Sequence, residues 1–595
     1  MSHTPNRRKF IVKSATALTA VAAGSILSAC GSSGSSARPS EFRYGVASGD
    51  PLTDRVILWT HARIADSSAA VGLTWQVAAN AGFDTLIASG RATATADTGF
   101  TVKVDATGLS AGTAYFYRFI DDAGVVSTVG TTRTLPKSDV SAVKFAVFSC
   151  SLYSAGYFNA YDAAAKSDAQ YAIHLGDYIY EYGSDPAKFG NADAVTLDRV
   201  TAPARDIVTL DDYRTRYARY RSDASLQAVH ARMPFITIWD DHEFADNAYV
   251  AGANNHDTAT QGDWITRKNI AARVYHEWLP IRTDASGKVL KIYRRFDFGT
   301  LLTLHMLDTR IEGRDRQYDS YGDADGGISR YVAGLTSGSD AGRRMISATQ
   351  QGWLTDGIGN SAAGWQLLGN QDIMARMWFP ASVLQAQNTA FIQPTPANQA
   401  AVGQAITDYL TAKATRAAAG SAALTPNQAA LLNTGSNPRV PYNLDAWDGY
   451  PLQREAILQA VKAQGKNLVT LSGDSHNAWF ANVTTLAGEK VGVEFATSSV
   501  TAPGFEAVGL GSLASALDGS ALVLQLGNAA IGAGLGLVDD LNYADTVRRG
   551  YLQLTVTRAA VTGEYVFVDT VKSKTYSATV GKAVTVAASG AINYA

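Results

Sequence analysis

The chain has 595 residues, of which 46% are hydrophobic and 17% are charged, and its formal net charge at pH 7 is −2. The apolar fraction suffices for a large buried core, and the balance of charges excludes a broad basic surface for nucleic acid or an acidic disordered tail. No apolar run of about 18 residues lacks polar breaks, so we expect an ordered, soluble protein of several domains without a membrane-spanning helix in its mature form.

The first thirty residues have the pattern of an export signal. Arg7 and Arg8 precede a short apolar stretch, Ser14 to Ala29, that ends in small residues. The paired arginines, with Phe10 behind them, resemble the signal read by the twin-arginine machinery, which exports folded proteins. The alternative is an ordinary secretion signal that contains two arginines, and either signal places the protein outside the cytoplasm.

The end of this signal resembles a lipobox. In Leu27–Cys30 the cysteine would become the acylated first residue of a lipoprotein, and the Gly/Ser-rich residues 31–40 would form a flexible tether. Cys150, the other cysteine, would then have no disulfide partner. The alternative is cleavage close by, which releases a soluble protein. We therefore expect a periplasmic or cell-surface protein whose membrane contact is a lipid anchor at Cys30.

Residues 41–138 predict a small fibronectin-like β-sandwich. Short apolar or alternating segments are separated by Gly, Asp and Asn, as is typical of antiparallel strands. The segments are 56–60, 73–77, 100–104 and 114–119, and the turn and strand at 109–118 resemble those of a fibronectin-like domain. Because no cluster of His, Cys or carboxylates marks a site there, we interpret this domain as a support or binding module.

From residue 143 to about 590 the pattern is that of an α/β domain. Six short apolar runs each end in a polar cluster, with helical stretches such as 158–167 and 264–278 between them. The runs are 143–149, 171–175, 235–239, 301–307, 365–368 and 468–472. Such folds carry their chemistry in loops just beyond the carboxyl ends of the strands. We therefore expect the reactive residues of these clusters to form the site.

Three further segments of this domain have their own patterns. Residues 381–445 are rich in Ala, Gln and Asn with helical apolar spacing, which predicts a helical insertion between two core strands. The Gly-, Ala- and Leu-rich segment 511–537 fits either a mobile flap or a packed helical cap, and the sequence leaves both open. Residues 551–586 return to a strand pattern.

Four of the strand ends carry residues suited to metal ions. They are Cys150 after the first run, Asp177 and Tyr180 after the second, Asp240, Asp241, His242 and Glu243 after the third, and Asp474 and His476 after the sixth. A carboxylate can bridge two cations, and a tyrosinate is a hard ligand suited to ferric iron. Each motif alone is weak, but together they predict a metal site. His174 lies within a strand, so we expect it to be packed rather than a ligand.

With these motifs the sequence resembles the PhoD-type alkaline phosphatases, metallophosphoesterases related to the purple acid phosphatases. The resemblance covers the chain from Tyr44 onward, with matching segments at 45–51, 56–60, 149–151, 156–159, 174–181, 239–243, 307–310 and 472–476. It implies an α/β metallophosphoesterase-like core of two packed mixed β-sheets flanked by helices, preceded by the small β-sandwich.

The resemblance also implies the cofactors, Fe³⁺ and Ca²⁺. The implied metal ligands are Cys150, Asp177 and Tyr180, which would hold the iron in part, together with Asp241, Asp474 and His476, which would complete the cluster. The superfamily's first Asp-x-His is here Ser149–Ser151, its Gly-Asn-His is Asp240–His242, and its Gly-His-x-His is Gly473–His476, with one imidazole in place of two. Fewer imidazoles and more carboxylates favour a hard cation such as calcium over zinc.

The implied activity is that of an exported, metal-dependent alkaline phosphatase and phosphodiesterase that releases phosphate from mono- and diesters by metal-activated in-line attack. His242 would act as hydrogen-bond donor or acid toward the leaving group, or else orient a carboxylate. Arg310 would clamp the phosphate, or else form a surface salt bridge. Two alternatives stay open, a phospholipase-like phosphodiesterase of the same fold and a surface binding lipoprotein with a degenerate site.

Overall fold

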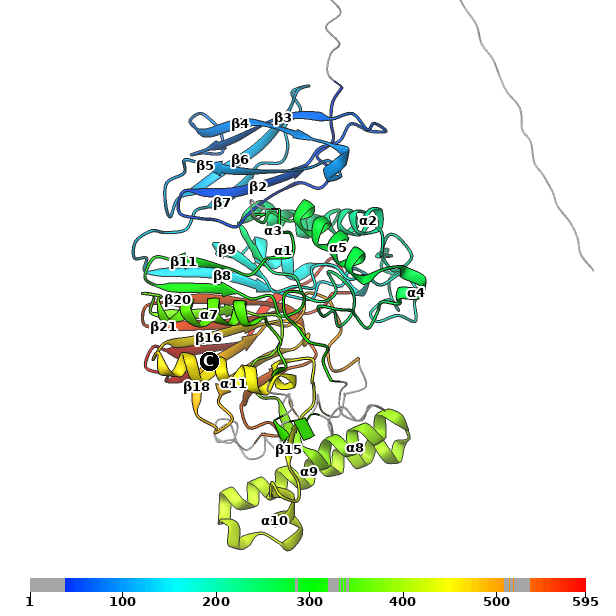
Figure 1. Ribbon diagram of the computed structural model, residues 1–595, viewed down its shortest axis with the longest axis vertical. Coiled ribbons are helices and arrows are strands. Elements are labelled where there is room, and N and C mark those ends of the chain that lie inside the picture. Colours follow the sequence, from blue (N-terminus) through cyan, green and yellow to red (C-terminus); the bar gives the residue numbers. More distant parts are fainter. Residues whose placement is uncertain are drawn as a thin grey trace, which may run out of the picture. The chain divides into compact units, whose positions relative to one another are not determined.

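The computed structural model describes residues 38–594, except for 284–286, 319–330, 332, 335–336, 339–341, 508–512, 514–516 and 518–535. The described residues from 39 onward form one compact unit, whose elements are shown in Figure 1. The predicted export signal, the lipobox and almost all of the segment 511–537 lie outside the described residues.

Seven strands near the start of the described chain form two layers that enclose their own apolar core. One has the strand order β4–β3–β6–β7, and the other contains β1, β2 and β5. Their bounds are β1 Val46–Gly49, β2 Arg55–His61, β3 Val71–Ala78, β4 Leu86–Ala94, β5 Thr101–Thr107, β6 Ala114–Asp121 and β7 Gly130–Arg133. Leu58, Leu73 and Tyr117 are fully buried between the two layers. Alternate residues of each strand face inward, and those of the two layers pack against each other there.

These strands are continuous with the rest of the unit. β1 pairs in parallel with β10 (Phe235–Thr237), so β1, β2 and β5 form one end of a ten-stranded sheet. A Cβ atom at Gly49 would lie 2.5 Å from the carbonyl oxygen of Pro280, so a side chain at this junction would collide with the backbone. The boundary near residue 138 is therefore not a break in the hydrogen-bonded sheet.

The ten-stranded sheet has the order β23–β22–β21–β20–β8–β9–β10–β1–β2–β5. Its central strands β8 (Ala142–Phe148), β9 (Tyr171–His174) and β10 are parallel to one another, and β20–β23 form an antiparallel end. The latter are β20 Arg549–Thr557, β21 Ala560–Val568, β22 Ala578–Ala587 and β23 Ile592–Tyr594.

A seven-stranded sheet has the order β11–β12–β13–β16–β18–β17–β19, and its strands β12, β13, β16 and β18 are parallel. The bounds are β11 Arg294–Phe298, β12 Leu302–Met306, β13 Trp365–Gly369, β16 Asn467–Ser472, β17 Ala478–Thr484, β18 Lys490–Ala496 and β19 Leu541–Asp545. Each of the six apolar runs in the sequence therefore coincides with a strand of one of the two large sheets.

Side chains from both large sheets meet in one core. The ring of Phe145 on β8 lies 5.3 Å from that of Phe298 on β11, and Phe495 on β18 lies 6.4 Å from Tyr565 on β21. Burying one such ring contributes about 1.5–3 kcal/mol to stability. Because parallel strands are covered on both faces, most of their residues are apolar, which explains the apolar runs in the sequence.

Helices cover the outer faces of the sheets. Residues of α1, α2, α3 and α5 belong to the core of the ten-stranded sheet, and residues of α7 and α11 pack on the seven-stranded sheet. The bounds are α1 Asn159–Ala165, α2 Leu210–Arg221, α3 Ala224–Arg232, α4 Thr258–Gln261, α5 Trp264–Trp278, α7 Ala348–Gly359 and α11 Pro451–Ala463. None of the helices in the described residues is long and apolar enough to cross a lipid bilayer.

The helical insertion begins after β14 (Trp378–Pro380) and ends at β15 (Arg439–Pro441), which pair with each other. Its helices are α8 Ala381–Ile392, α9 Pro396–Ala419 and α10 Pro426–Leu432. Thr395 caps α9 by accepting from the NH of Asn398, and Pro396 begins the helix where no NH donor is needed. In Figure 1 these helices lie beyond the β14–β15 pair, apart from both large sheets.

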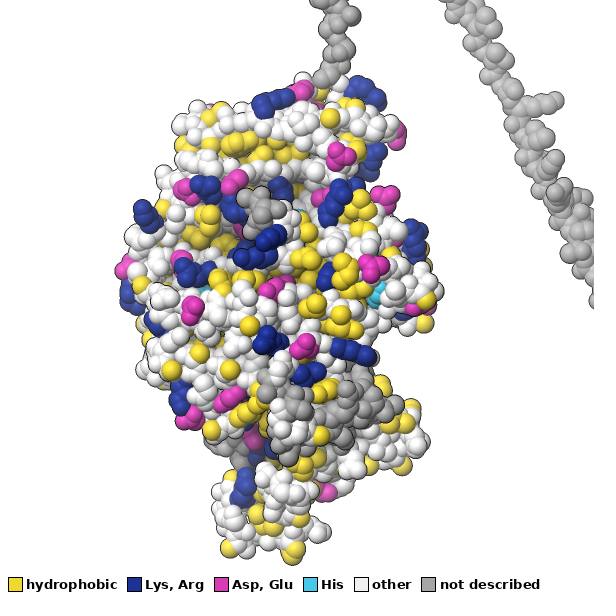
Figure 2. All heavy atoms as spheres, in the orientation of Figure 1, with side chains coloured by type: hydrophobic (Ala, Val, Ile, Leu, Met, Phe, Trp, Pro, Cys, Tyr) yellow, Lys and Arg dark blue, Asp and Glu magenta, His cyan; other side chains and the backbone are white. Residues whose placement is uncertain are grey.

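Charged side chains of both signs are interspersed over the face shown in Figure 2. This distribution agrees with the near-zero net charge of the sequence, in which 51 basic residues balance 53 acidic ones.

Candidate metal centre

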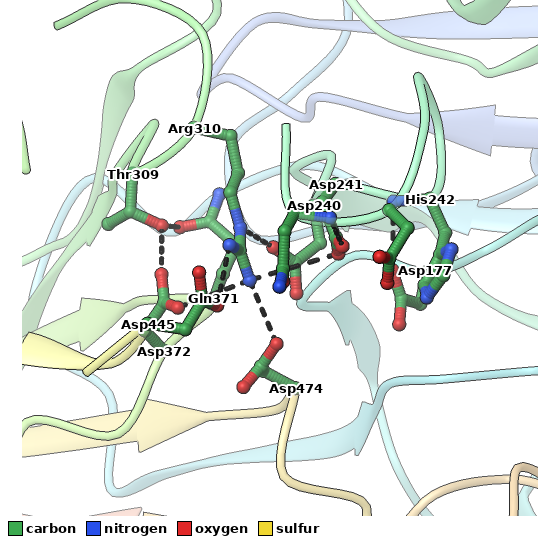
Figure 3. Close-up of polar contacts among 12 residues, drawn as sticks. Asp177, Asp240, Asp241, His242, Thr309, Arg310, Gln371, Asp372, Asp445 and Asp474 are labelled. Atoms are coloured by element: carbon green, nitrogen blue, oxygen red, sulfur yellow. Dashed lines mark hydrogen bonds and ion pairs between the residues drawn. The ribbon is translucent and has the colours of Figure 1, made fainter. Parts of the chain in front are cut away.

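Loops after the carboxyl ends of six strands meet in one place. The NH of Cys150, after β8, donates to the carbonyl of Gly176, after β9, at 3.1 Å. The NH of Gly473, after β16, donates to the carbonyl of Gln371, after β13, at 2.8 Å. Figure 3 shows the convergence of side chains that follow β9, β10, β12, β13 and β16.

Four of the predicted metal ligands have a left-handed backbone. The φ angles are 57° at Cys150, 54° at Asp177, 54° at Asp474 and 63° at His476. Non-glycine residues adopt this conformation at a cost of about 1–3 kcal/mol, and such residues concentrate at functional sites. The surrounding fold therefore holds these four side chains in a geometry that the isolated loops would not favour.

The first of two neighbouring groups combines a thiol, a carboxyl, a phenol and an imidazole. Ligand atoms of Cys150, Asp177 and His476 lie within 4.8 Å of one another. The hydroxyl of Tyr180 donates to Oδ2 of Asp177 at 2.9 Å and lies 3.1 Å from Nε2 of His476. Nδ1 of His476 donates to the carbonyl of Pro503 at 2.6 Å, so Nε2 keeps its lone pair for the site.

The second group is a set of carboxylates around one arginine. Arg310 is fully buried, and its guanidinium donates to Asp240, to Asp445 at 2.7 Å and to Asp474 at 2.8 Å. Asp372 lies 3.2 Å from the same guanidinium. Ligand oxygens of Asp372, Asp445 and Asp474 lie within 4.8 Å of one another, as do those of Asp240, Asp241 and Asp474.

This arrangement concentrates negative charge. Six carboxylates, those of Asp177, Asp240, Asp241, Asp372, Asp445 and Asp474, lie near two arginines, Arg310 and Arg314. Burial, strengthened by the neighbouring Asp241, raises the pKa of Asp177 to about 7. Burial likewise raises the pKa values of Asp240 and Asp474 well above the usual range of a carboxyl.

The donor set fits metal ions. Oδ2 of Asp240 is buried and has no hydrogen-bond partner among the described residues. Burial and the Asp177 carboxylate raise the pKa of Cys150, as expected for a thiol among carboxylates without a cation. Oxygen-rich groups suit calcium, whereas thiolate, phenolate and imidazole suit a transition metal such as iron. Bound cations would compensate the excess charge and use the unpartnered oxygen.

A buried glutamate ties the loops after β9 and β10 together. Glu243 accepts from the NH groups of Asp177 at 2.9 Å, Tyr178 at 2.6 Å and Asp240 at 2.8 Å. Burial and the nearby Asp177 raise the pKa of Glu243 to about 8, although these three donors oppose that shift. The carboxyl group of Glu243 thus fixes the backbone from which two of the candidate ligands extend.

His242 lies beside Asp177, as Figure 3 shows. A ring nitrogen of His242 lies within 4.8 Å of ligand oxygens of Asp177 and Asp241, and Nδ1 lies 2.6 Å from Oε2 of Glu181. The imidazole stacks on the ring of Tyr180 at 4.2 Å. His242 is therefore at the edge of the first group, and its ring is held by Glu181 at Nδ1 and by Tyr180 on one face.

The structure brings all eight residues singled out for the site into these two groups. Their individual roles stay predictions. Arg310 donates to carboxylates and has no exposed surface, so a phosphate that contacts it must replace one of those partners.

His174 is fully buried, its Nε2 lies 2.8 Å from the hydroxyl of Tyr161, and burial lowers its pKa to about 3. Trp239 and Trp479 are also buried.

Sequence reasoning did not single out several residues of the site. Asp372 directly follows the polar residues Asn370 and Gln371 at the end of a strand, so its position in the sequence could have predicted a place in the site. Asp445 follows the helical insertion rather than a core strand, and no local pattern marks it. Glu181 lies four residues after Asp177, and only the structure shows its contact with His242.

Comparisons with known proteins agree on one family. The model of the PhoD-like phosphatases matches residues 145–565, and that of the PhoD-like phosphatase N-terminal domain matches residues 28–136. The chain is 31% identical over 482 residues to alkaline phosphatase D of Bacillus subtilis (strain 168), covering 78% of this chain and 70% of the relative. A solved structure described as that of PhoD superposes with a TM-score of 0.71 at 27% identity, covering 93% of this chain and 92% of the other.

Proposed function

Because the chain belongs to the PhoD-like phosphatase family, we propose that it is an exported, metal-dependent alkaline phosphatase that hydrolyses both phosphate mono- and diesters. One observation carries the proposal: six carboxylates, a thiol, a phenol and two imidazoles converge from five strand ends and the segment after the helical insertion, beside two arginines, Arg310 and Arg314. A protein that only binds a partner has no need of so costly an arrangement.

We assign the two groups to two kinds of ion. Cys150, Tyr180 and His476 would hold Fe³⁺, with Asp177 between the groups, because these donors suit a transition metal. Asp241 and Asp474 would hold Ca²⁺ together with neighbouring carboxylates, because calcium takes only oxygen ligands. When bound, such ions neutralise the phosphate and lower the pKa of a water molecule.

The chain's own residues supply the remaining functions. His242 lies at the edge of the first group, where a ring N–H can donate to the oxygen of the leaving group. Arg310 balances the carboxylates and would donate to an incoming phosphate in place of one of them. Tyr180 and Tyr182 flank the imidazole, with ring centroids 4.2 and 5.1 Å away, and keep water from its faces.

Hydrolysis of 4-nitrophenyl phosphate and bis(4-nitrophenyl) phosphate tests the proposal directly. Each rate is measured at alkaline pH on the exported protein as isolated, after chelation of calcium, and after calcium is returned. We expect chelation to remove turnover and calcium to restore it, and the ratio of the two rates gives the balance of monoester and diester activity. Protein that contains its metals yet hydrolyses neither ester would contradict the proposal.

Export and anchoring are separate parts of the proposal. Arg7 and Arg8 support transport by the twin-arginine machinery, and Cys30 supports acylation. Replacing both arginines by lysines should retain the protein in the cytoplasm, and Cys30→Ala should move it from the membrane fraction to the soluble fraction. Membrane association that persists in Cys30→Ala would exclude the lipid anchor.

A further inference from the structure

The loop that follows β9 presents two aromatic rings at the edge of the candidate metal centre. Tyr182 and Phe189 are both partly exposed. The ring of Phe189 stacks on that of His476, with centroids 5.7 Å apart and planes inclined by 19°. Tyr182 meets the imidazole of His242 edge-on, with centroids 5.1 Å apart. Since each ring lies against an imidazole of the site, this loop borders the place where a substrate would bind.

The loop is held in one conformation by its own polar groups. Asn191 is 2% exposed, and its Nδ2 donates to the carbonyls of Gly183 and Asp185, both at 2.8 Å. Gly190 has a φ of 70°, and a Cβ atom there would overlap Cδ2 of Leu152 in the loop after β8. The backbone on either side of Phe189 is therefore fixed, and the ring is presented by a built loop.

The two rings differ in how fully they are occupied. The hydroxyl of Tyr182 donates to Oδ1 of Asp246 at 3.3 Å, and Nζ of Lys188 lies 5.9 Å from the centroid of its ring. Among the described residues, His476 is the one ring that stacks on Phe189, and no cation lies over it. The exposed part of the Phe189 ring is therefore open to a flat group of a bound molecule.

The neighbouring metal groups limit what that molecule can be. A phosphate ester bound there brings its leaving group to the edge of the centre, where Phe189 lies. Nucleotides are the esters that join a phosphate to a flat aromatic base, and bases stack on aromatic side chains whatever their sequence. On the basis of the proposed phosphatase activity, we propose that Phe189 is a specificity-determining residue that stacks on the base of a nucleoside monophosphate.

A matched pair of esters tests this role. Adenosine 5′-monophosphate and ribose 5-phosphate release the same kind of alkoxide and differ in the base alone. With the protein that contains its metals, we expect kcat/KM to be about tenfold higher for the nucleotide. In Phe189→Leu this preference should disappear, with a change of less than about twofold for ribose 5-phosphate, because leucine keeps an apolar contact with His476 but has no flat face. Phe189→Trp should retain the preference.

Two further measurements accompany the variants. Phe391→Leu makes the same substitution at a phenylalanine of α8 that is 65% exposed, and it should change neither rate. Adenosine alone should inhibit hydrolysis of ribose 5-phosphate more strongly than ribose does. Phe189→Leu should weaken that inhibition about tenfold.

Each other outcome counts against the proposal. Equal rates for the two esters in the unmodified protein, or a preference that persists in Phe189→Leu, would overturn it. Equal losses on both esters in Phe189→Leu, with or without loss of bound metal, would show that Phe189 only packs against His476. If the nitrophenyl esters are hydrolysed but the nucleotide is not preferred, the role of Phe189 fails and the proposed function stands.

Discussion

Asp177 is the residue on which the two sides of the candidate metal centre depend. Its carboxylate lies within 4.8 Å of ligand atoms of Cys150 and His476, and also of ligand atoms of Asp241 and His242. Its backbone is left-handed, with φ of 54°, and its NH is bonded to Glu243. A carboxylate shared in this way can bridge two cations, as the sequence predicts.

Replacing Asp177 by Asn should abolish turnover without unfolding the protein. Asparagine tolerates the left-handed backbone and can still accept from Tyr180, but it cannot supply the charge that two cations require. We expect kcat/KM for 4-nitrophenyl phosphate to fall by at least about a thousandfold. Elemental analysis should show reduced iron and calcium, with a circular dichroism spectrum that matches the original.

Asp66→Asn is the matched control for this prediction. Asp66 is exposed and also has a positive φ, 53°, so the same substitution is made on the same kind of backbone. Activity and metal content should remain at their original levels. Near-normal turnover in Asp177→Asn would contradict the bridging role.

His61 makes the N-terminal sandwich sensitive to acid. It is 8% exposed and packs against the rings of Tyr44 and Trp278, with centroids 4.7 and 5.7 Å away. Burial lowers its pKa from 6.5 to about 4. The unfolded chain therefore binds this proton first, and the free energy of unfolding decreases as the pH falls from 6.5 to 4.

His61→Phe should remove that decrease, because a phenyl ring fits the aromatic surroundings and binds no proton. Between pH 7 and pH 5 the histidine lowers the free energy of unfolding by about 1–2 kcal/mol. The fall in that free energy should therefore be smaller by this amount in the variant than in the original protein. Urea unfolding followed by tryptophan fluorescence at the two pH values measures the difference. Identical acid sensitivity in both proteins would exclude His61 as the source.

At the scale of the elements, the site depends on how closely neighbouring strand ends approach. Gly176 follows β9 with φ of 104°, and a Cβ atom there would lie 2.4 Å from Cβ of Asp240, which follows β10. At the end of β16, a Cβ atom on Gly473 would lie 2.6 Å from Cβ of Ser149. Glycine is therefore required at these two crossings of ligand loops.

Gly176→Ala should separate the loops after β9 and β10. The substitution adds backbone strain of about 1–3 kcal/mol. It also overlaps the backbone nitrogen of Asp240, 2.6 Å from the added Cβ. We expect a lower melting temperature together with loss of bound metal and of phosphatase activity.

Gly124→Ala separates strain from overlap. Its φ is 86°, and no atom lies within 4 Å of the added Cβ. This variant should lose only the strain energy, about 1–3 kcal/mol, and keep its metals and its activity. If both variants behave alike, contact between the loops is not what excludes alanine at Gly176.

The same elements explain how far the sequence could be interpreted. Both faces of β8, β9 and β16 are buried, so their residues form apolar runs that predict the strands and the clusters after them. The pairing of β1 with β10 joins the backbones of residues 49 and 235, so no pattern of side chains in the sequence predicts it. Asp445 and Glu181 likewise enter the site through contacts between distant segments.

At the scale of the molecule, the sandwich and the phosphatase core behave as one structure. Besides the shared sheet, Nε1 of Trp59 donates to the carbonyl of Glu277 at 2.8 Å. Nζ of Lys103 donates to the carbonyl of Ile281 at 3.1 Å and to Oγ1 of Thr283 at 2.9 Å. Both contacts of Lys103 are partly buried, and burial lowers the pKa of Lys103 to about 8.

Removing residues 39–138 should therefore prevent folding of the remainder. Deletion leaves one edge of β10 without its partner and exposes Trp278, and exposed edges of this kind aggregate. The intact protein should unfold in a single calorimetric transition, and removal of residues 1–38 alone should leave that transition in place. A soluble, active protein that starts at residue 139 would show that the core folds alone.

The ligands of the two metal groups span the chain from residue 150 to residue 476 and include Asp445, which follows the helical insertion. A chain still emerging from the ribosome cannot bring them together until the strands from β8 to β16 and the insertion have been synthesised. Capture of the proposed ions would therefore be a late event, which only a chain with these segments in place could perform. From that point the supply of cations would govern how long the protein survives heat and proteases, because ions that bind only the native state add to its stability.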